Sequence, residues 1–229
     1  MVALTTNDVW AVGSIRNYTS INALTDSTLI EHWNGQQWSV VTLPATLTNG
    51  GFNNVTAIAK DDVWAVGETS MAANPPSQNL IAHWDGQQWS AIPNPNKAYT
   101  NPWESISASS ANDIWSVSGL DVIEHWDGQQ WKVIQQTDKI PSLLYSLDAI
   151  APNNIWAVGG VQPNTGSTNQ PAAGHWDGKN WNSIPQPRSV QGILSGIASA
   201  GGRLWAVGIA YSNGYQQIAS TLIESNTCV

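Results

Sequence analysis

A tryptophan-centred repeat constrains this chain more than any other feature of its sequence. The hexapeptide DVWAVG, or a close variant of it, occurs five times, around Trp10, Trp64, Trp115, Trp156 and Trp205. A second motif, HWNG or HWDG, follows four of these copies, and a further tryptophan comes five residues after the tryptophan of that motif. The repeat therefore accounts for 13 of the 14 tryptophans. Its period of about 49 residues lies in the range of propellers, solenoids and other arrays.

Each repeat predicts four short antiparallel strands, which we call A to D. The runs are rich in Val, Ile, Thr and Trp, contain no proline and end at turn residues. In the first repeat, strand B is expected at 9–13, strand C at 29–33 and strand D at 37–41. Residues 54–59 then supply strand A of the next repeat. Asn34-Gly35, between strands C and D, suits a tight hairpin turn with positive φ, and Asp-Gly recurs there in three later repeats.

These strands predict an all-β protein in which residues 1–229 form a single domain, a five-bladed β-propeller of four-stranded antiparallel blades. One blade is expected to be incomplete, because strand C of the fifth repeat, at 222–225, has no strand D after it. The missing strand exposes a sheet edge, which favours a homodimer formed through that edge.

The repeated motifs resemble the blades of bacterial relatives of the WD40 and Kelch propellers. Five repeats in about 230 residues also resemble the five-bladed lectin tachylectin-2. These resemblances imply the propeller fold over nearly the whole chain. They do not select one function, because propellers serve as binders, scaffolds and enzymes.

Composition excludes two classes of partner. The net charge is -8 and the 8 Lys and Arg residues are scattered, so the clustered cations that bind nucleic acid are missing. No apolar run has the length of a membrane-spanning helix, so no membrane insertion is expected.

The single cysteine, Cys228, cannot form an internal disulfide. Low charge and amide-rich loops favour secretion or the cell surface.

Four histidines, one in each of the first four repeats, raise the question of a metal site. They lie on strand C, far from the propeller axis, so histidines of different blades diverge and cannot share an ion. The position two before the motif tryptophan is Asp or Asn in the same four repeats, whereas Arg203 and Ser225 replace both partners in the fifth. This joint replacement predicts a hydrogen bond between strand C and strand B of each blade. We expect neither a metal nor a cofactor.

Variable loops on a fixed scaffold are where binding is expected. The B–C loops, predicted at 14–27, 68–78, 160–171 and 209–220, differ in length between repeats. They should rim one face of the propeller together with the D–A loops. Their amides and flat rings suit the hydroxyls and C–H faces of a neutral sugar, although the same residues are also common in solvated loops. The predicted ligand-binding residues are Trp103, Tyr99, Tyr145, Tyr211, Asn74, Asn96 and Gln162.

Trp103 is the one tryptophan outside the repeat, and it has two interpretations. It could stack on a ligand at the mouth of the channel. It could equally occupy a core position, because the corresponding residues of other repeats are Phe52, Leu144 and Ile193.

Three functions follow from these features. The favoured one is non-enzymatic binding of a glycan or another neutral polar ligand. A protein-interaction or structural module of a larger surface protein explains the incomplete blade equally well. A glycosidase-like hydrolase would use Glu104 and Asp148, the two acids near strand A, which lines the channel.

Overall fold

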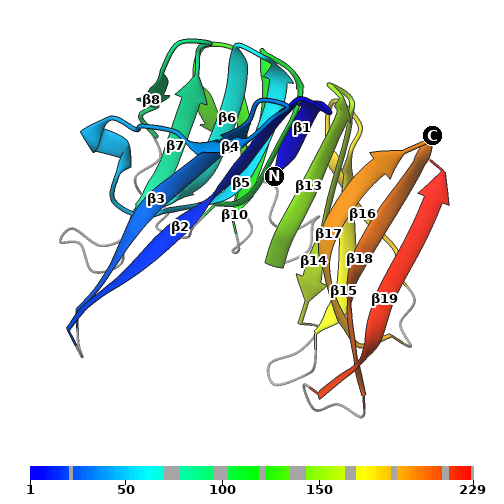
Figure 1. The fold of residues 1–229 in the computed structure, drawn as a ribbon. Helices are drawn as coiled ribbons and strands as arrows, with labels where there is room; N and C mark the ends of the chain where they lie inside the picture. Colours follow the sequence, from blue (N-terminus) through cyan, green and yellow to red (C-terminus); the bar gives the residue numbers. More distant parts are fainter. Residues whose placement is uncertain are drawn as a thin grey trace. The chain divides into compact units, whose positions relative to one another are not determined.

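The computed structural model describes residues 1–20, 23–69, 78–94, 103–118, 122–134, 143–162, 169–186, 190–212 and 217–227. In these residues the chain forms five antiparallel sheets, four of four strands and one of three. Each repeat of the sequence builds one sheet from consecutive strands, and we call each sheet a blade (Figure 1). The predicted all-β architecture of antiparallel blades is confirmed, and the fifth blade has three described strands.

The strands follow the repeat closely. Blade 1 contains β1 (Val2–Thr5), β2 (Asp8–Ser20), β3 (Ala23–Trp33) and β4 (Trp38–Val40). Blade 2 contains β5 (Gly51–Ala59), β6 (Asp62–Glu68), β7 (Asn79–Trp84) and β8 (Trp89–Ala91). Blade 3 contains β9 (Trp103–Ser110), β10 (Asp113–Ser118), β11 (Val122–Trp126) and β12 (Trp131–Val133). Blade 4 contains β13 (Leu143–Ala151), β14 (Asn154–Val161), β15 (Gln170–Trp176) and β16 (Trp181–Ile184). Blade 5 contains β17 (Gly192–Ala200), β18 (Arg203–Ser212) and β19 (Gln217–Thr227).

One short helical turn, η1 (Ala45–Leu47), follows blade 1. Within the described ranges, no helix has the length and apolar character to cross a membrane. The chain divides into two compact units, Met1–Ile114 with His125–Lys132 and Trp115–Glu124 with Val133–Val229. Unit 1 holds blades 1 and 2, unit 2 holds blades 4 and 5, and the boundary runs through blade 3. A single domain over the whole chain stays a prediction.

Two predicted loops are largely strand. The ladder of β2 and β3 continues to the pair Ser20 and Ala23, so most of 14–27 is a long hairpin (blue in Figure 1). Arg16 and Asp26 form an ion pair across it, 3.1 Å from Nε to Oδ1. In blade 5, β18 and β19 likewise occupy most of 209–220. The prediction was wrong because neither glycine nor proline interrupts 14–20, and an antiparallel ladder extends until a turn residue ends it.

Tryptophans pack between neighbouring blades in unit 1. The ring of Trp10 lies 5.2 Å from that of Trp84 and 5.5 Å from that of Trp89 in blade 2. Trp64 repeats this contact with the two tryptophans of blade 3, Trp126 at 5.2 Å and Trp131 at 6.1 Å. Each strand B tryptophan is thus covered by the strand C and strand D tryptophans of the following blade.

The same contact recurs in unit 2. Trp115 lies 5.3 Å from Trp176 and 6.0 Å from Trp181 of blade 4. Blade 5 carries Asn226 at the strand C tryptophan position and no described strand D, so Trp156 has no such pair and is only half-buried. The contact between blades 4 and 5 rests instead on a smaller cluster of aliphatic side chains, Val158, Ala173, Leu194 and Ala206. Repeated tryptophans therefore pack between blades 1 and 2, 2 and 3, and 3 and 4.

The last glycine of the hexapeptide lets strand A approach strand B closely. A Cβ added to Gly67 would lie 2.0 Å from the carbonyl oxygen of Gly51, and one added to Gly159 would lie 1.6 Å from that of Leu143. An extra residue in strand A, Asn53 in blade 2, forms a bulge at this point. The motif glycine is therefore required by backbone contact in these blades. Blade 3 carries Ser118 at the same position.

Candidate functional site

The histidine network predicted from the repeat is present in four blades. Each histidine Nε2 lies within hydrogen-bond distance of the Oδ1 of an Asp or Asn on strand B of its own blade. The pairs are His32 with Asp8 at 2.8 Å, His83 with Asp62 at 2.9 Å, His125 with Asp113 at 2.7 Å and His175 with Asn154 at 3.0 Å. In the part of the chain that the structure describes, no three His, Cys, Asp or Glu side chains are grouped so that they could hold a metal ion.

The strand B partner also fixes the motif tryptophan in two blades. The indole Nε1 of Trp64 donates to Asp62 Oδ1 at 2.8 Å, and the His83 ring stacks 4.3 Å from the Trp64 ring. Burial lowers the pKa of His175, and the nearby charge of Asp177 opposes this shift. A histidine held between an aromatic ring and a hydrogen-bond partner stabilises the blade, and this structural role explains why it recurs in four blades.

The two candidate catalytic acids lie in different units. Glu104 on β9 belongs to unit 1, and burial, with a smaller effect of the nearby Glu68 charge, raises its pKa. Asp148 on β13 belongs to unit 2, and its Oδ2 is buried with no hydrogen-bond partner among the described residues. They also occupy different positions of the repeat, 11 residues before Trp115 and 8 before Trp156. Neither unit contains both acids of the predicted pair.

The B–C and D–A segments meet at one end of the blades in each unit, as predicted. In unit 1, the D–A residue Gly50 donates its backbone N–H to the carbonyl oxygen of Asp26 at 3.0 Å. In unit 2, Gly192 donates to Asn169 at 2.8 Å, which joins the D–A segment before blade 5 to the B–C segment of blade 4. Tyr211 donates its N–H to the carbonyl oxygen of Gln191 at 2.8 Å, which adds the B–C hairpin of blade 5.

These bonds gather neutral polar side chains at one end of blades 4 and 5. Gln162 and Tyr211 hold the same repeat position, each six residues after its motif tryptophan. Tyr145 is the extra residue of the strand A bulge in blade 4, near this end of the sheet. All the members are partly or fully exposed, and none carries a charge. We call this group, Tyr145, Gln162, Asn169, Gln191 and Tyr211, the amide–tyrosine end.

Of the seven predicted ligand-binding residues, three belong to the amide–tyrosine end: Tyr145, Gln162 and Tyr211. Three more, Asn74, Asn96 and Tyr99, lie outside the described residues. Sequence reasoning missed Gln191, for which the only signal was its place before the glycine that begins β17.

Trp103 occupies a core position and not a binding surface. Its side chain is 1% exposed, and its ring lies 4.9 Å from the ring of Trp131. The carbonyl oxygen of Trp103 also accepts a hydrogen bond from Asn53 Nδ2 of blade 2 at 3.0 Å. Of the two interpretations of Trp103, the structure therefore supports the core, because a buried ring offers no face to a ligand.

Comparison with solved structures identifies proteins of similar fold. YCF48 bound to D1 peptide matches with a TM-score of 0.53 at 20% identity, over 78% of this chain and 56% of that one. YCF48 from Cyanidioschyzon merolae matches with a TM-score of 0.51 at 15% identity, over 94% and 74%. The GH74 xyloglucanase from Xanthomonas campestris matches with a TM-score of 0.59 at 13% identity, over 96% and 38%. The fold is a β-propeller.

This likeness concerns the fold alone, because identities of 13% to 20% carry no residue-level correspondence of sites. The chain spans 56% of the length of the peptide-bound YCF48 and 38% of that of the xyloglucanase. No protein-family model matches the sequence, and neither does any curated protein.

Proposed function

We propose that this chain is a non-enzymatic binding propeller that holds a glycan, or another neutral polar ligand, at the amide–tyrosine end of blades 4 and 5. The observation that carries the proposal is the pair of backbone bonds from Gly192 to Asn169 and from Tyr211 to Gln191. They bring three separate segments of the chain to one rim. Binding residues held on loops by a rigid sheet scaffold are the usual arrangement of such sites.

The chemistry of the rim suits a neutral sugar. Side-chain amides both donate and accept hydrogen bonds, as sugar hydroxyls require, and phenol rings present flat faces to sugar C–H groups. The absence of charge among the five members disfavours phosphate or carboxylate ligands, which need cationic partners.

A glycan array tests the proposal directly. The wild-type chain is expected to bind a defined sugar, and Tyr211→Ala is expected to abolish that binding while leaving the circular dichroism spectrum unchanged. Gln87→Ala is the matched control, because Gln87 is an exposed residue of a C–D turn and lies outside the amide–tyrosine end. Failure of the wild-type chain to bind any sugar, or unchanged binding by Tyr211→Ala, contradicts the proposal.

A protein-interaction module is the second candidate, and exposed tryptophans favour it. Trp38 and Trp205 are 44% and 41% exposed, and such rings are typical anchors of protein interfaces. One structural neighbour, YCF48, was solved with a bound peptide. The module predicts a blank glycan array together with a protein ligand whose binding depends on one of these tryptophans.

A hydrolase is the third candidate, and the observation that favours it is that burial raises the pKa of Glu104, the direction that suits a general acid. Hydrolysis of a neutral glycan by the wild-type chain, lost in Glu104→Gln and in Asp148→Asn, would establish it. Hydrolysis that survives both substitutions, or none at all, would exclude these acids.

A further inference from the structure

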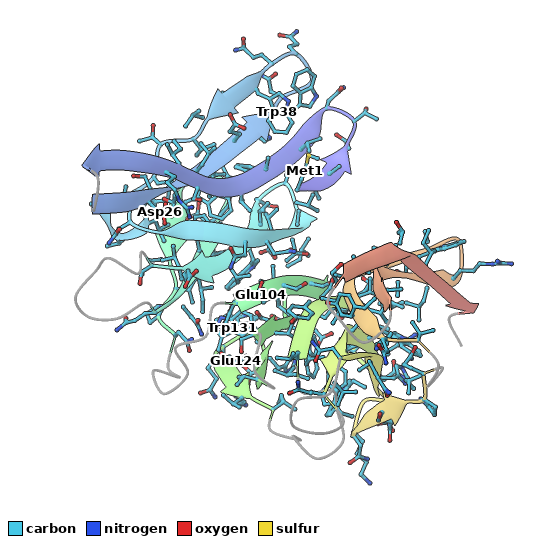
Figure 2. All side chains as sticks on the ribbon, turned by 90° about the horizontal axis from the view of Figure 1, so that it is seen from below. Met1, Asp26, Trp38, Glu104, Glu124 and Trp131 are labelled. Atoms are coloured by element: carbon cyan, nitrogen blue, oxygen red, sulfur yellow. The ribbon has the colours of Figure 1, made fainter. Side chains whose placement is uncertain are left out.

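The partner of the strand C histidine changes from a carboxylate to an amide in blade 4. In blades 1 to 3, the histidine Nε2 meets the Oδ1 of an aspartate on strand B at 2.7 to 2.9 Å. In blade 4 (yellow-green to yellow in Figure 2), His175 meets Asn154 Oδ1 at 3.0 Å instead. All four histidines are half-buried. The four sites therefore share one geometry and differ in the charge of the strand B partner.

The hydrogen bonds around Asn154 determine which form of His175 fits the blade. The indole Nε1 of Trp156 donates to Asn154 Oδ1 at 2.8 Å, and an indole N–H can only donate, so the amide oxygen must lie at this point. His175 therefore has to donate an N–H from Nε2, which a neutral ring does. A second proton, on Nδ1, gives the ring a positive charge. An aspartate at position 154 would balance that charge, and the amide does not.

No charge on the neighbouring strands replaces the missing carboxylate. The strands β14, β15 and β16 contain no Asp, Glu, Lys or Arg. Neither does β17 of blade 5, which packs against β14 and β15. The acid on β13, Asp148, pairs with Trp156, which in turn pairs with His175. Asp148 thus lies two strands away from His175, about 10 Å.

The C–D turn beside His175 adds one charge of each sign, Asp177 and Lys179. The Asp177 carboxylate accepts hydrogen bonds from the backbone N–H groups of Lys179 and Asn180. Blade 2 has Asp85 at the position of Asp177, with the same two backbone bonds. The turn therefore does not distinguish blade 4 from blade 2, and the amide at position 154 does.

The pKa of His175 agrees with this geometry. Burial lowers it below the ordinary value of 6.5, and the charge of Asp177 opposes the shift. The unfolded chain therefore takes up the proton at a higher pH than folded blade 4 does. The contribution of His175 to stability is complete above pH 6.5 and declines as the pH falls through this value.

We propose that blade 4 is an acid-sensitive element of this propeller, which loosens in mildly acidic solution because His175 faces an amide where the other histidines face a carboxylate. The bond that protonation weakens joins strands B and C of the blade, β14 and β15. In blades 1 to 3 a protonated ring and an aspartate attract each other, so the corresponding strands stay joined.

Hydrogen exchange of the full chain, followed blade by blade with mass spectrometry, tests the proposal. The pH is lowered from about 7.5 to about 5.5, across the ordinary pKa of histidine. The protection factors of β14 and β15 should fall at least about twofold more than those of β6 and β7, the corresponding strands of blade 2. Asn154→Asp should remove this difference, because it restores the pair of the other blades. Asp62→Asn, the matched reverse change, should make β6 and β7 acid-sensitive.

His175→Gln separates the effect of the proton from that of packing. Glutamine can still donate to Asn154 but takes up no proton in this range, so blade 4 should lose its acid sensitivity. Circular dichroism at neutral pH establishes that each variant is folded. Equal loss of protection in blades 2 and 4 of the wild-type chain overturns the proposal. Acid sensitivity of blade 4 that survives Asn154→Asp or His175→Gln overturns it as well.

Discussion

Replacing Trp64 with alanine should destabilise the chain far more than the same change at Trp205. The two residues share one position of the repeat but differ in their surroundings. Trp64 is 4% exposed, contacts Trp126 and Trp131 of the next blade, and donates a hydrogen bond to Asp62. Trp205 is 41% exposed and has no ring contact among the described residues. The two variants therefore carry the same substitution and differ in how deeply the replaced ring is buried.

The loss in free energy of unfolding can be worked out from the buried area of the ring and from the cavity that its removal leaves. A buried tryptophan removes about 200 Å² from water, which at about 25 cal/mol per Å² amounts to about 5 kcal/mol as an upper bound. Measured Trp→Ala losses in cores are about 3 to 5 kcal/mol, including the cavity. We expect Trp64→Ala to lose about 4 kcal/mol. Trp205→Ala should lose about 2 kcal/mol, because less area is buried and water fills the open site.

Guanidinium denaturation followed by circular dichroism measures both losses as shifts of the midpoint at constant slope. The protein concentration must be low enough that chains do not associate, since association adds apparent stability. Equal losses for the two variants would refute the burial argument. A loss below about 1 kcal/mol for Trp64→Ala would show that this ring is not part of the core.

The remaining predictions concern one backbone contact and one turn. Gly67→Ala should lower the unfolding midpoint strongly, because its Cβ would meet the Gly51 carbonyl oxygen at 2.0 Å, whereas Gly13→Ala, with nothing within 4 Å, should change stability by less than about 0.5 kcal/mol; equal shifts in denaturation would contradict this reasoning. Carboxyl NMR should place the pKa of Asp127 at about 2, lowered chiefly by Lys132, and Lys132→Met should raise it. Since the pKa of Asp127 in the folded chain lies below its ordinary value of 3.8, this contribution to stability is present above pH 3.8 and is lost as the pH falls toward 2.

Much of the fold could be read from the repeat, because every blade must meet the same physical demands. The joint presence of histidine and Asp or Asn in the same repeats was enough to predict the hydrogen bond between strand C and strand B. The Asn-Gly and Asp-Gly turns were equally predictable. Gly35 has φ of 91°, and Asn34 Oδ1 accepts hydrogen bonds from the backbone N–H groups of Gln36 and Gln37. A residue type that recurs at one position identifies a structural role.

Features specific to one blade were harder to predict. Ile193 was expected at the strand A core position of blade 5, but the register places Leu194 there, opposite Gly208. In blades 2 and 4 a bulge near the A–B turn sets this register, and blade 5 lacks it and turns through Gly201-Gly202 instead. A shift of the strand register by one residue cannot be recognised when positions are counted from the motif tryptophan.

The candidate site was predicted only in part for a related reason. The loop composition indicated amides and tyrosines, but it could not say which of them share a rim. Backbone bonds between segments far apart in the sequence, such as that from Gly192 to Asn169, decide this. Trp103 shows the opposite case, where departure from the repeat marked a larger core residue and not a binding residue.

Hydroxyl-radical footprinting with mass spectrometry tests most directly the claim that tryptophans pack between blades 1 and 2, 2 and 3, and 3 and 4. Trp38 and Trp205, which are exposed, should oxidise rapidly, while Trp64, Trp89 and Trp103 should be protected. Rapid oxidation of Trp64 or Trp103 would contradict the claim.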